Sequence, residues 1–296
     1  MKLKQIFIFI IALLLLFEWI SAYFIGGLFG VVSWWGIIGG SILGVILSFI
    51  CFITFLLKLV RRKKISSSSI ILFLLFLIMA WPACWLLSIG NLPYPAKIDS
   101  TKPTVSIELP FKESVTVGWG GNQIETNKPH VLVPNERWAY DFIMEPHSLK
   151  SKKLNDYGIY NKEIISPVKG TIVGAYDQEK DITLGTENND TMAGNYIYIK
   201  IEETGTYLVL AHIKQNSILV KNVQAVDVGT PLAKVGNSGS TSEPHLHIHH
   251  QRQNPATTSM YLSEGLPLYF HNINGSSMPI GGEHGEVISP KKEAIQ

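Results

Sequence analysis

Three long apolar runs dominate the first part of the chain, at residues 6–25, 34–59 and 69–90. Each run holds roughly the 20 apolar residues that a helix needs to cross a hydrocarbon core about 30 Å thick. We therefore expect three membrane-spanning helices within residues 1–90, the first two joined by a hairpin through residues 26–36.

The first apolar run resembles the start of a secretory signal peptide only superficially. A cleavable signal has an apolar core of about 7–15 residues followed by a small-residue cleavage site. Residues 6–25 form a longer run, and two further runs follow it. We interpret it as a membrane anchor, and the alternative is that the first run is removed from the mature protein.

Short runs rich in β-branched and aromatic residues follow a Pro-rich linker at residues 91–103. Glycine-containing turns separate these runs, and helical periodicity is almost absent. This pattern predicts a compact, mostly antiparallel β domain over residues 104–296, with an exposed loop at residues 145–162. The expected strands are residues 105–109, 115–119, 164–173, 195–201, 207–213, 218–220, 231–235 and 245–250.

Charge is distributed unevenly between the two parts of the chain. The first 96 residues hold seven Lys or Arg and one acidic residue, so that of the whole-chain charge of +2 the other 200 residues carry −4. A mildly acidic soluble part lacks the basic surface that nucleic-acid binding requires, so we expect no nucleic-acid partner. The basic residues instead indicate topology, because Lys and Arg favour the cytoplasmic side. Lys2, Lys4 and residues 61–64 thus predict a multi-pass protein of the cell membrane whose β domain is extracytoplasmic.

One acidic residue, Glu18, lies inside the first apolar run. A carboxylate that faces lipid is costly, so we expect Glu18 at a helix–helix contact, and a functional intramembrane site is the alternative. The three runs carry almost no other polar residues, which gives little support to a transporter or channel function.

Cysteine and histidine usage limits the metal chemistry that is available. The two cysteines, Cys51 and Cys84, both lie in apolar runs, so the predicted β domain can hold neither a disulfide framework nor a thiolate zinc site. All nine histidines lie beyond residue 96. Any metal site must therefore be built from His and carboxylate ligands.

The densest group of such residues is His245-Leu246-His247, within SEPHLHIHHQR. Residues i and i+2 of a strand point to one face, so His245 and His247 can converge on one metal or on its ligands. His249 continues the same face, and His250 points away. A lone strand histidine is more often a hydrogen-bonded structural residue, so the pair alone is a weak motif.

Two further residues strengthen the pattern. His212 ends the alternating strand TYLVLAHI, and Asp141 is a carboxylate within an otherwise apolar strand. Along the chain the order is an Asp, a strand ending in His, a Gly-Asn-Ser-Gly turn and then the His-Leu-His pair. Neutral imidazole and carboxylate suit Zn²⁺, and three protein ligands with an open fourth position form the catalytic arrangement.

These stretches resemble the M23 peptidase family, the LytM- and lysostaphin-type zinc endopeptidases. The matching segments are SPVKGTIV (166–173), GNYIYIKIEETGTYLVLAHI (194–213) and VDVGTPLAKVGNSGSTSEPHLHIHH (227–250), in the family's order. The resemblance implies an antiparallel β-sheet groove of the LytM type that holds one zinc and cleaves short peptides of peptidoglycan. It also implies that Asp141 and His247 are zinc ligands, and that His212 and His245 are the non-ligand catalytic histidines that activate water and stabilise the oxyanion.

The first motif of the family departs from its usual His-x-Gly-x-Asp form. Arg137 stands where the ligand histidine is expected, and a guanidinium has no lone pair to offer a metal. A recognisable variant of the family instead carries WGG, an upstream Asn-x-(x)-His and a Gln/Asn-x-Arg-aromatic-Ala-aromatic-Asp run. On this resemblance His130 is the replacement ligand. The alternatives are His249, or a site that binds zinc weakly or not at all.

Two functions follow from this comparison. The first is an active zinc metalloendopeptidase, a hydrolase of the cell wall whose substrates are peptidoglycan peptides. The second is a catalytically inactive scaffold that binds wall peptides or regulates a partner hydrolase. The retained Asp141, His212 and His-Leu-His set favours the enzyme, and the substituted first motif favours the scaffold.

Overall fold

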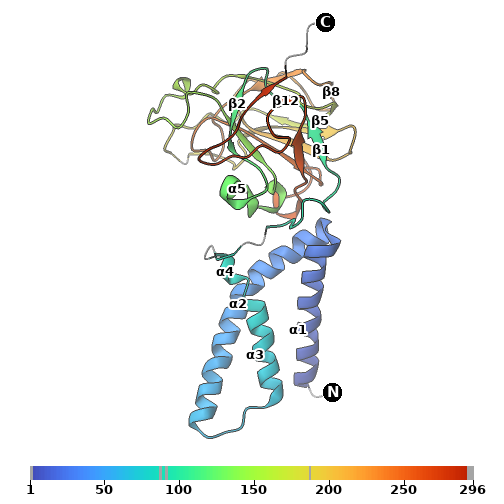
Figure 1. Cartoon of the computed structure of the whole chain (residues 1–296), viewed down its shortest axis with the longest axis vertical. Helices are drawn as coiled ribbons and strands as arrows, with labels where there is room; N and C mark the ends of the chain where they lie inside the picture. The colour runs from blue at the N-terminus through green and yellow to red at the C-terminus, as the bar shows by residue number, and fades with distance from the viewer. Residues whose placement is uncertain (1–2, 87–88, 91–92, 187, 292–296) are drawn as a thin grey trace. The chain divides into compact units, whose positions relative to one another are not determined.

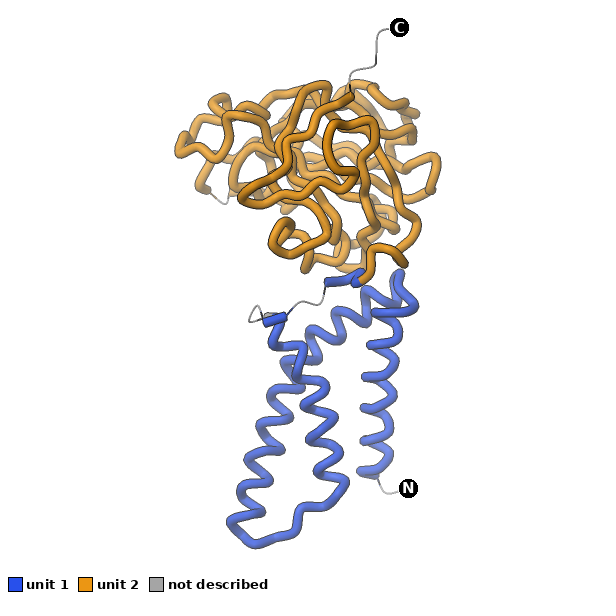
Figure 2. The backbone as a smooth tube through the Cα atoms, viewed as in Figure 1, with its two compact units in different colours: residues 1–96 blue, residues 97–296 orange. Residues whose placement is uncertain are grey.

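The structure, a computed structural model, describes residues 3–86, 89–90, 93–186 and 188–291. The chain divides into two compact units, Met1–Ala96 and Lys97–Gln296, which Figure 2 shows in different colours. The division falls inside the predicted linker. The end of the third predicted run at residues 87–88, the start of the linker at residues 91–92 and the last five residues of the predicted β domain lie outside the described residues.

The first unit consists of apolar helices (Figure 1). Three helical segments are long and apolar enough to cross a membrane, so the predicted helices are confirmed: Leu3–Ile25, Gly27–Val60 and Ser67–Trp85. They contain α1 (Leu3–Ile20), the π-helical turn η1 (Ser21–Ile25), α2 (Gly27–Val60), α3 (Ser67–Ala80) and the start of α4 (Ala83–Leu86).

The predicted hairpin through residues 26–36 is wrong in its extent. Gly26 alone separates η1 from α2, and its φ of 71° is one that glycine adopts at little cost. Residues 27–36 are already helical, because apolar residues interleave with the glycines there and bury Val31 and Trp34. A run of glycines therefore marks close helix packing here instead of a loop.

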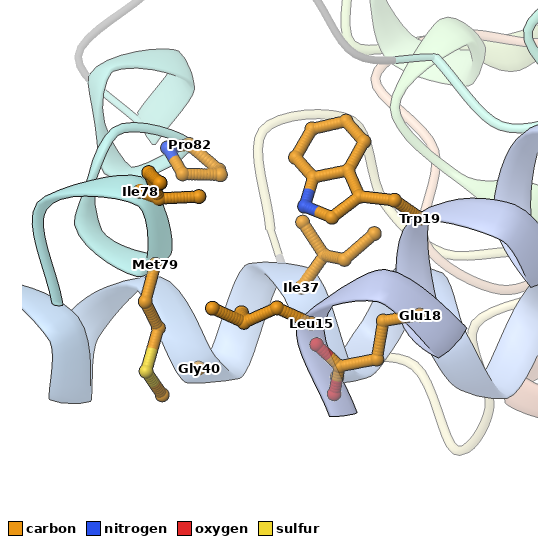
Figure 3. A pocket seen from close by; sticks show the side chains of 9 residues that line it. Leu15, Glu18, Trp19, Ile37, Gly40, Ile78, Met79 and Pro82 are labelled. Atoms are coloured by element: carbon orange, nitrogen blue, oxygen red, sulfur yellow. The ribbon is translucent and has the colours of Figure 1, made fainter. Parts of the chain in front are cut away.

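Close packing between the helices depends on small residues. A Cβ at Gly44 of α2 would lie 2.6 Å from the backbone nitrogen of Ala80 in α3. Trp19 of α1 stacks on Trp81 with ring centroids 5.9 Å apart. Figure 3 shows the small pocket between the three helices, with Glu18 at one side, and a Cβ at Gly36 would lie 2.7 Å from Oε1 of Glu18. Glu18 thus lies at a helix–helix contact, as expected.

The second unit is built on a nine-stranded antiparallel sheet with the strand order β12-β13-β2-β3-β10-β7-β6-β5-β8. Two further pairs, β1-β11 and β4-β9, complete the β structure. The strands are β1 (Val105–Ile107), β2 (Val115–Trp119), β3 (Tyr140–Ile143), β4 (Glu163–Ile165), β5 (Gly170–Tyr176), β6 (Asn195–Ile201), β7 (Tyr207–Ile213), β8 (Ala225–Val226), β9 (Pro231–Lys234), β10 (Leu246–Gln251), β11 (Leu268–Phe270), β12 (Ile273–Asn274) and β13 (Val287–Pro290).

Alternation along the strands gives the sheet two different faces. One face carries aliphatic and aromatic side chains into the core, for example Phe142 of β3 and Ile248 of β10. Because successive side chains point to opposite faces, Asp141 and His247 lie on the other face. The apolar periodicity of the strands thereby fixes where the Asp141 and His247 side chains project.

Several details of the β domain differ from expectation. Residues 218–220 form no strand, and residues 164–173 divide between β4 and β5 around a turn. Residues 145–162 are not fully exposed, since Tyr157 and Ile159, next to the 3₁₀ turn η3 (Leu154–Asp156), are buried. The helix α5 (Ile124–Val131) was not expected, because it contains Pro129 and a non-helical backbone at Asn127.

Candidate metal centre

Strands β3 and β10 bring the first two site residues together. Asp141 and His247 are directly opposite each other in the antiparallel register. Nδ1 of His247 lies 3.0 Å from Oδ1 of Asp141, and both residues are buried. A strand register that is fixed by the core face therefore sets the geometry of this pair.

His130 reaches the same carboxylate from α5. Its Nε2 lies 3.4 Å from Oδ2 of Asp141. On the other side of the ring, Nδ1 lies 2.7 Å from Oδ1 of Asn127, whose amide nitrogen donates to the carbonyls of Gly121 and Ala139. Since that amide nitrogen faces two acceptors, its oxygen must accept from Nδ1–H of His130. The lone pair of the neutral His130 ring is therefore on Nε2 and faces Asp141.

His130, Asp141 and His247 form a compact group of potential metal ligands. Their ligand atoms all lie within 4.8 Å of one another, and all three residues are buried. Two imidazoles and a carboxylate are a donor set that zinc prefers. The chemistry of these residues therefore fits a zinc ion.

The electrostatics of the group keep its carboxylate ionised. Burial by itself raises the pKa of Asp141, but the nearby His130 and His245 and the hydrogen bond to His247 outweigh it and hold that pKa well below its usual range. Burial lowers the pKa of His130, which favours the neutral ring that a metal requires.

His212 and His245 lie beside this group. Their ring centroids are 4.5 Å apart, and that of His212 is 6.0 Å from that of His247. Nδ1 of His245 lies 2.8 Å from the carbonyl oxygen of Glu243, and its Nε2 lies 3.7 Å from Oδ1 of Asp141. The structure thus brings all five predicted site residues together, the four histidines and Asp141.

His212 is held in an unusual backbone conformation with φ of 60°. Its Nδ1–H donates to the carbonyl oxygen of Ser238 at 2.8 Å, so the lone pair of the neutral ring is on Nε2. Burial, followed by the neighbouring His245 and His247, holds the pKa of His212 well below its usual range. His212 is therefore a neutral imidazole that can accept a proton.

A buried polar network behind His212 was not predicted from the sequence. Asn195 donates from Nδ2 to the carbonyls of Glu179 and Ile213, and the Ser238 hydroxyl donates to Ile213 as well. The Glu179 carboxylate in turn accepts from the backbone N–H of Gly239. The Gly-Asn-Ser-Gly turn was the visible signal for this network, whereas Glu179 gave none.

Arg137 and His249 do not occupy the ligand group. The guanidinium of Arg137 donates to both oxygens of Asn122 and lies 4.8 Å from the Trp138 ring centroid. Nδ1 of His249 lies 2.9 Å from Nε2 of His247. His249, His247 and Glu136 form a second group of potential metal ligands. The residue that replaces the expected first histidine thus has a packing role.

Residues 156–258 match the family model described as Peptidase family M23. This part of the chain, which includes His212, His245 and His247, is similar to peptidase family M23. His130 and Asp141 precede the matched residues. A search of curated proteins found no match.

Solved structures similar to this chain include two peptidases and an M23 protein. The antimicrobial peptidase lysostaphin from Staphylococcus simulans is 16% identical over 51% of this chain and 47% of its own, with a TM-score of 0.34. A zinc-containing peptidase from Vibrio cholerae is 19% identical over 49% and 36%, with a TM-score of 0.32. The catalytic domain of a mutant of the prophage-encoded M23 protein EnpA from Enterococcus faecalis is 14% identical over 55% and 93%, with a TM-score of 0.33. The chain spans about half the length of the first of these, and the match to the family model covers residues 156–258.

Proposed function

We propose that this protein is a membrane-anchored zinc endopeptidase that cleaves peptides of peptidoglycan outside the cytoplasmic membrane. The observation that carries the proposal is the buried group of His130, Asp141 and His247, inside a unit that contains the residues similar to peptidase family M23. The donor atoms converge on one point, and every donor is a type that binds zinc.

In this proposal zinc is held by Nε2 of His130, Nδ1 of His247 and the carboxylate of Asp141. Three protein ligands leave a further position open to water or substrate. When bound, the ion supplies Lewis acidity that polarises a peptide carbonyl and acidifies water. Asn127 orients His130 for this role, because it fixes the ring proton on Nδ1.

His212 would act as the general base. Its Nε2 carries the lone pair of a neutral ring that is fixed through Ser238, so it can take the proton of the attacking water. Nδ1 of His245 donates to the Glu243 carbonyl, so the imidazolium form of His245, with a second proton on Nε2, would donate a hydrogen bond to the oxygen that gains negative charge. Neither ring is needed to hold the ion, so both are available for proton transfer and charge stabilisation.

The proposed location follows from the basic residues. Lys4 lies near the start of α1, and residues 61–64 lie between α2 and α3. Positive residues on the cytoplasmic side would place the N-terminus and this connection inside, and the β domain outside, where peptidoglycan lies. The protein is then integral to the cytoplasmic membrane, and its partners are wall peptides.

A scaffold without catalysis is the second candidate. It is favoured by one observation, the presence of Arg137 where the resemblance expects a ligand histidine. A scaffold would use the same sheet face to bind wall peptides or to regulate a partner hydrolase.

The metal content of the full-length chain, purified in detergent, tests the zinc site. The account predicts one zinc per chain, loss of zinc in Asp141→Asn, and retention in His271→Gln, a control at a half-exposed histidine that contacts Ser106. A folded wild-type chain that binds no zinc would contradict the proposal.

A further inference from the structure

Three side chains on β10, those of His247, His249 and Gln251, form a hydrogen-bonded row. Nε2 of His247 lies 2.9 Å from Nδ1 of His249, and Nε2 of His249 lies 3.0 Å from Oε1 of Gln251. The row ends where Nε2 of Gln251 approaches the carbonyl oxygen of Gln253 at 2.7 Å. All three side chains are buried, and they alternate along the strand, so they share the face of Asp141.

The hydrogen-bond direction along this row is determined by its far end. The Gln253 carbonyl can only accept, so the amide nitrogen of Gln251 faces it and the amide oxygen faces His249. His249 must then carry its proton on Nε2. A neutral imidazole has a single ring proton, so Nδ1 of His249 is an acceptor and Nε2 of His247 is the donor.

We propose that His249 and Gln251 are positioning residues that hold a proton on Nε2 of His247, so that the metal can be bound only through Nδ1. This inference deepens the proposed function and rests on its zinc site. Nδ1 is the nitrogen that faces Asp141. It follows that His249 is not itself a ligand, because both of its ring nitrogens are used along the row.

The tautomer of each proposed histidine ligand is thus set by a buried side-chain amide. Asn127 contacts His130 directly, whereas Gln251 acts on His247 through one intervening ring. Partners of this kind orient the ring and select its tautomer, and losing one commonly costs about 10–100-fold in metal affinity.

Zinc affinity of the full-length chain in detergent, measured by chelator competition, tests the row. His249→Phe keeps a ring but removes the acceptor, and we expect its zinc Kd to rise about 10–100-fold. His249→Gln supplies one acceptor and one donor in the same order, and should recover most of the affinity. His250→Phe is the matched control, because His250 is also buried but bonds to Thr206 and Pro267 on the core side. It should leave the zinc Kd unchanged.

Nitrogen-15 spectra of the histidine rings in the metal-free wild-type chain give an independent readout. We expect His249 to carry its proton on Nε2 and none on Nδ1, and His247 to carry one on Nε2. A proton on Nδ1 of His249, or an unchanged zinc Kd in a folded His249→Phe chain, would overturn the inference. If the wild type binds no zinc, the proposed function fails, whereas the ring spectra still decide the direction of the row.

Discussion

Oδ1 of Asn127 lies 2.7 Å from Nδ1 of His130, and this contact turns the other ring nitrogen toward Asp141. The amide of Asn127 cannot flip without placing its oxygen against the carbonyls of Gly121 and Ala139. The carbonyls of Gly121 and Ala139, acting through the Asn127 amide, therefore specify the tautomer of a proposed metal ligand. The main role of α5 in the proposed site is to supply this contact between Asn127 and His130.

Replacement of Asn127 tests that relationship. Asn127→Leu removes the acceptor, and we expect zinc affinity to fall about 10–100-fold because the ring of His130 loses its orientation. Asn127→Asp keeps an oxygen toward His130 but sets its second oxygen against the carbonyls of Gly121 and Ala139, so its zinc affinity should fall between that of wild type and that of Asn127→Leu. Chelator competition measures both variants. Equal affinity in wild type and a folded Asn127→Leu chain would show that the contact does not position the ligand.

The two non-ligand histidines separate chemistry from metal binding. His212→Ala and His245→Ala should keep zinc content near that of wild type while peptide cleavage falls about 10²–10³-fold. His247→Ala should lose both zinc and cleavage. Zinc stoichiometry, cleavage rate and melting temperature are measured on the same three chains. If His212→Ala or His245→Ala lowers melting temperature but not rate, that residue is structural.

Much of the β domain was predictable because its strands alternate cleanly. Strands β2, β6 and β7 begin and end where the pattern predicts. β2 and β6 bury alternate residues against the core, and β7 is buried from Leu208 to Ile213. Residues 218–220 are all apolar but form no strand, since Leu219 is 68% exposed and the short run has too little buried surface to hold one.

The site was predictable only in part. Asp141 and His247 stand out as polar residues in apolar strands, but their pairing depends on a register between segments 106 residues apart. The approach of His130 depends on α5. This helix shows no helical periodicity in the sequence, because it contains Pro129 and is irregular at Asn127. The supporting Gln251 and Glu179 resemble ordinary surface residues in the sequence, although both are buried in the structure.

The core-side histidine predicts a pH dependence of stability. Burial lowers the pKa of His250 to about 4, whereas an unfolded histidine titrates near 6.5. Between these values the unfolded state binds a proton that the folded state does not, so the contribution is complete above about pH 6.5 and is lost as pH falls toward 4. Amide exchange in β6 and β7 should show the stability gap between wild type and His250→Gln narrowing over this range, by at most about 3 kcal/mol. Parallel pH profiles would contradict the assignment.

Topology can be tested by cysteine labelling in intact cells. In a chain with Cys51 and Cys84 replaced by Ser, Leu219→Cys introduces a thiol at a side chain that is 68% exposed. An impermeant reagent should label it in intact cells, because the proposed orientation places the β domain outside. Lys63→Cys, in the connection between α2 and α3, is the matched control and should label only after lysis. The reverse pattern would overturn the orientation.

Zinc-dependent cleavage of peptidoglycan is the most direct test of the central claim that the buried His130, Asp141 and His247 group forms the centre of a peptidase. The measurement is the release of new amino termini from purified peptidoglycan by the full-length chain in detergent. The account predicts release by wild type, its loss on chelation, its return with added zinc, and no release by Asp141→Asn. A zinc-loaded, folded wild-type chain that releases no amino termini would contradict the enzyme and favour the scaffold.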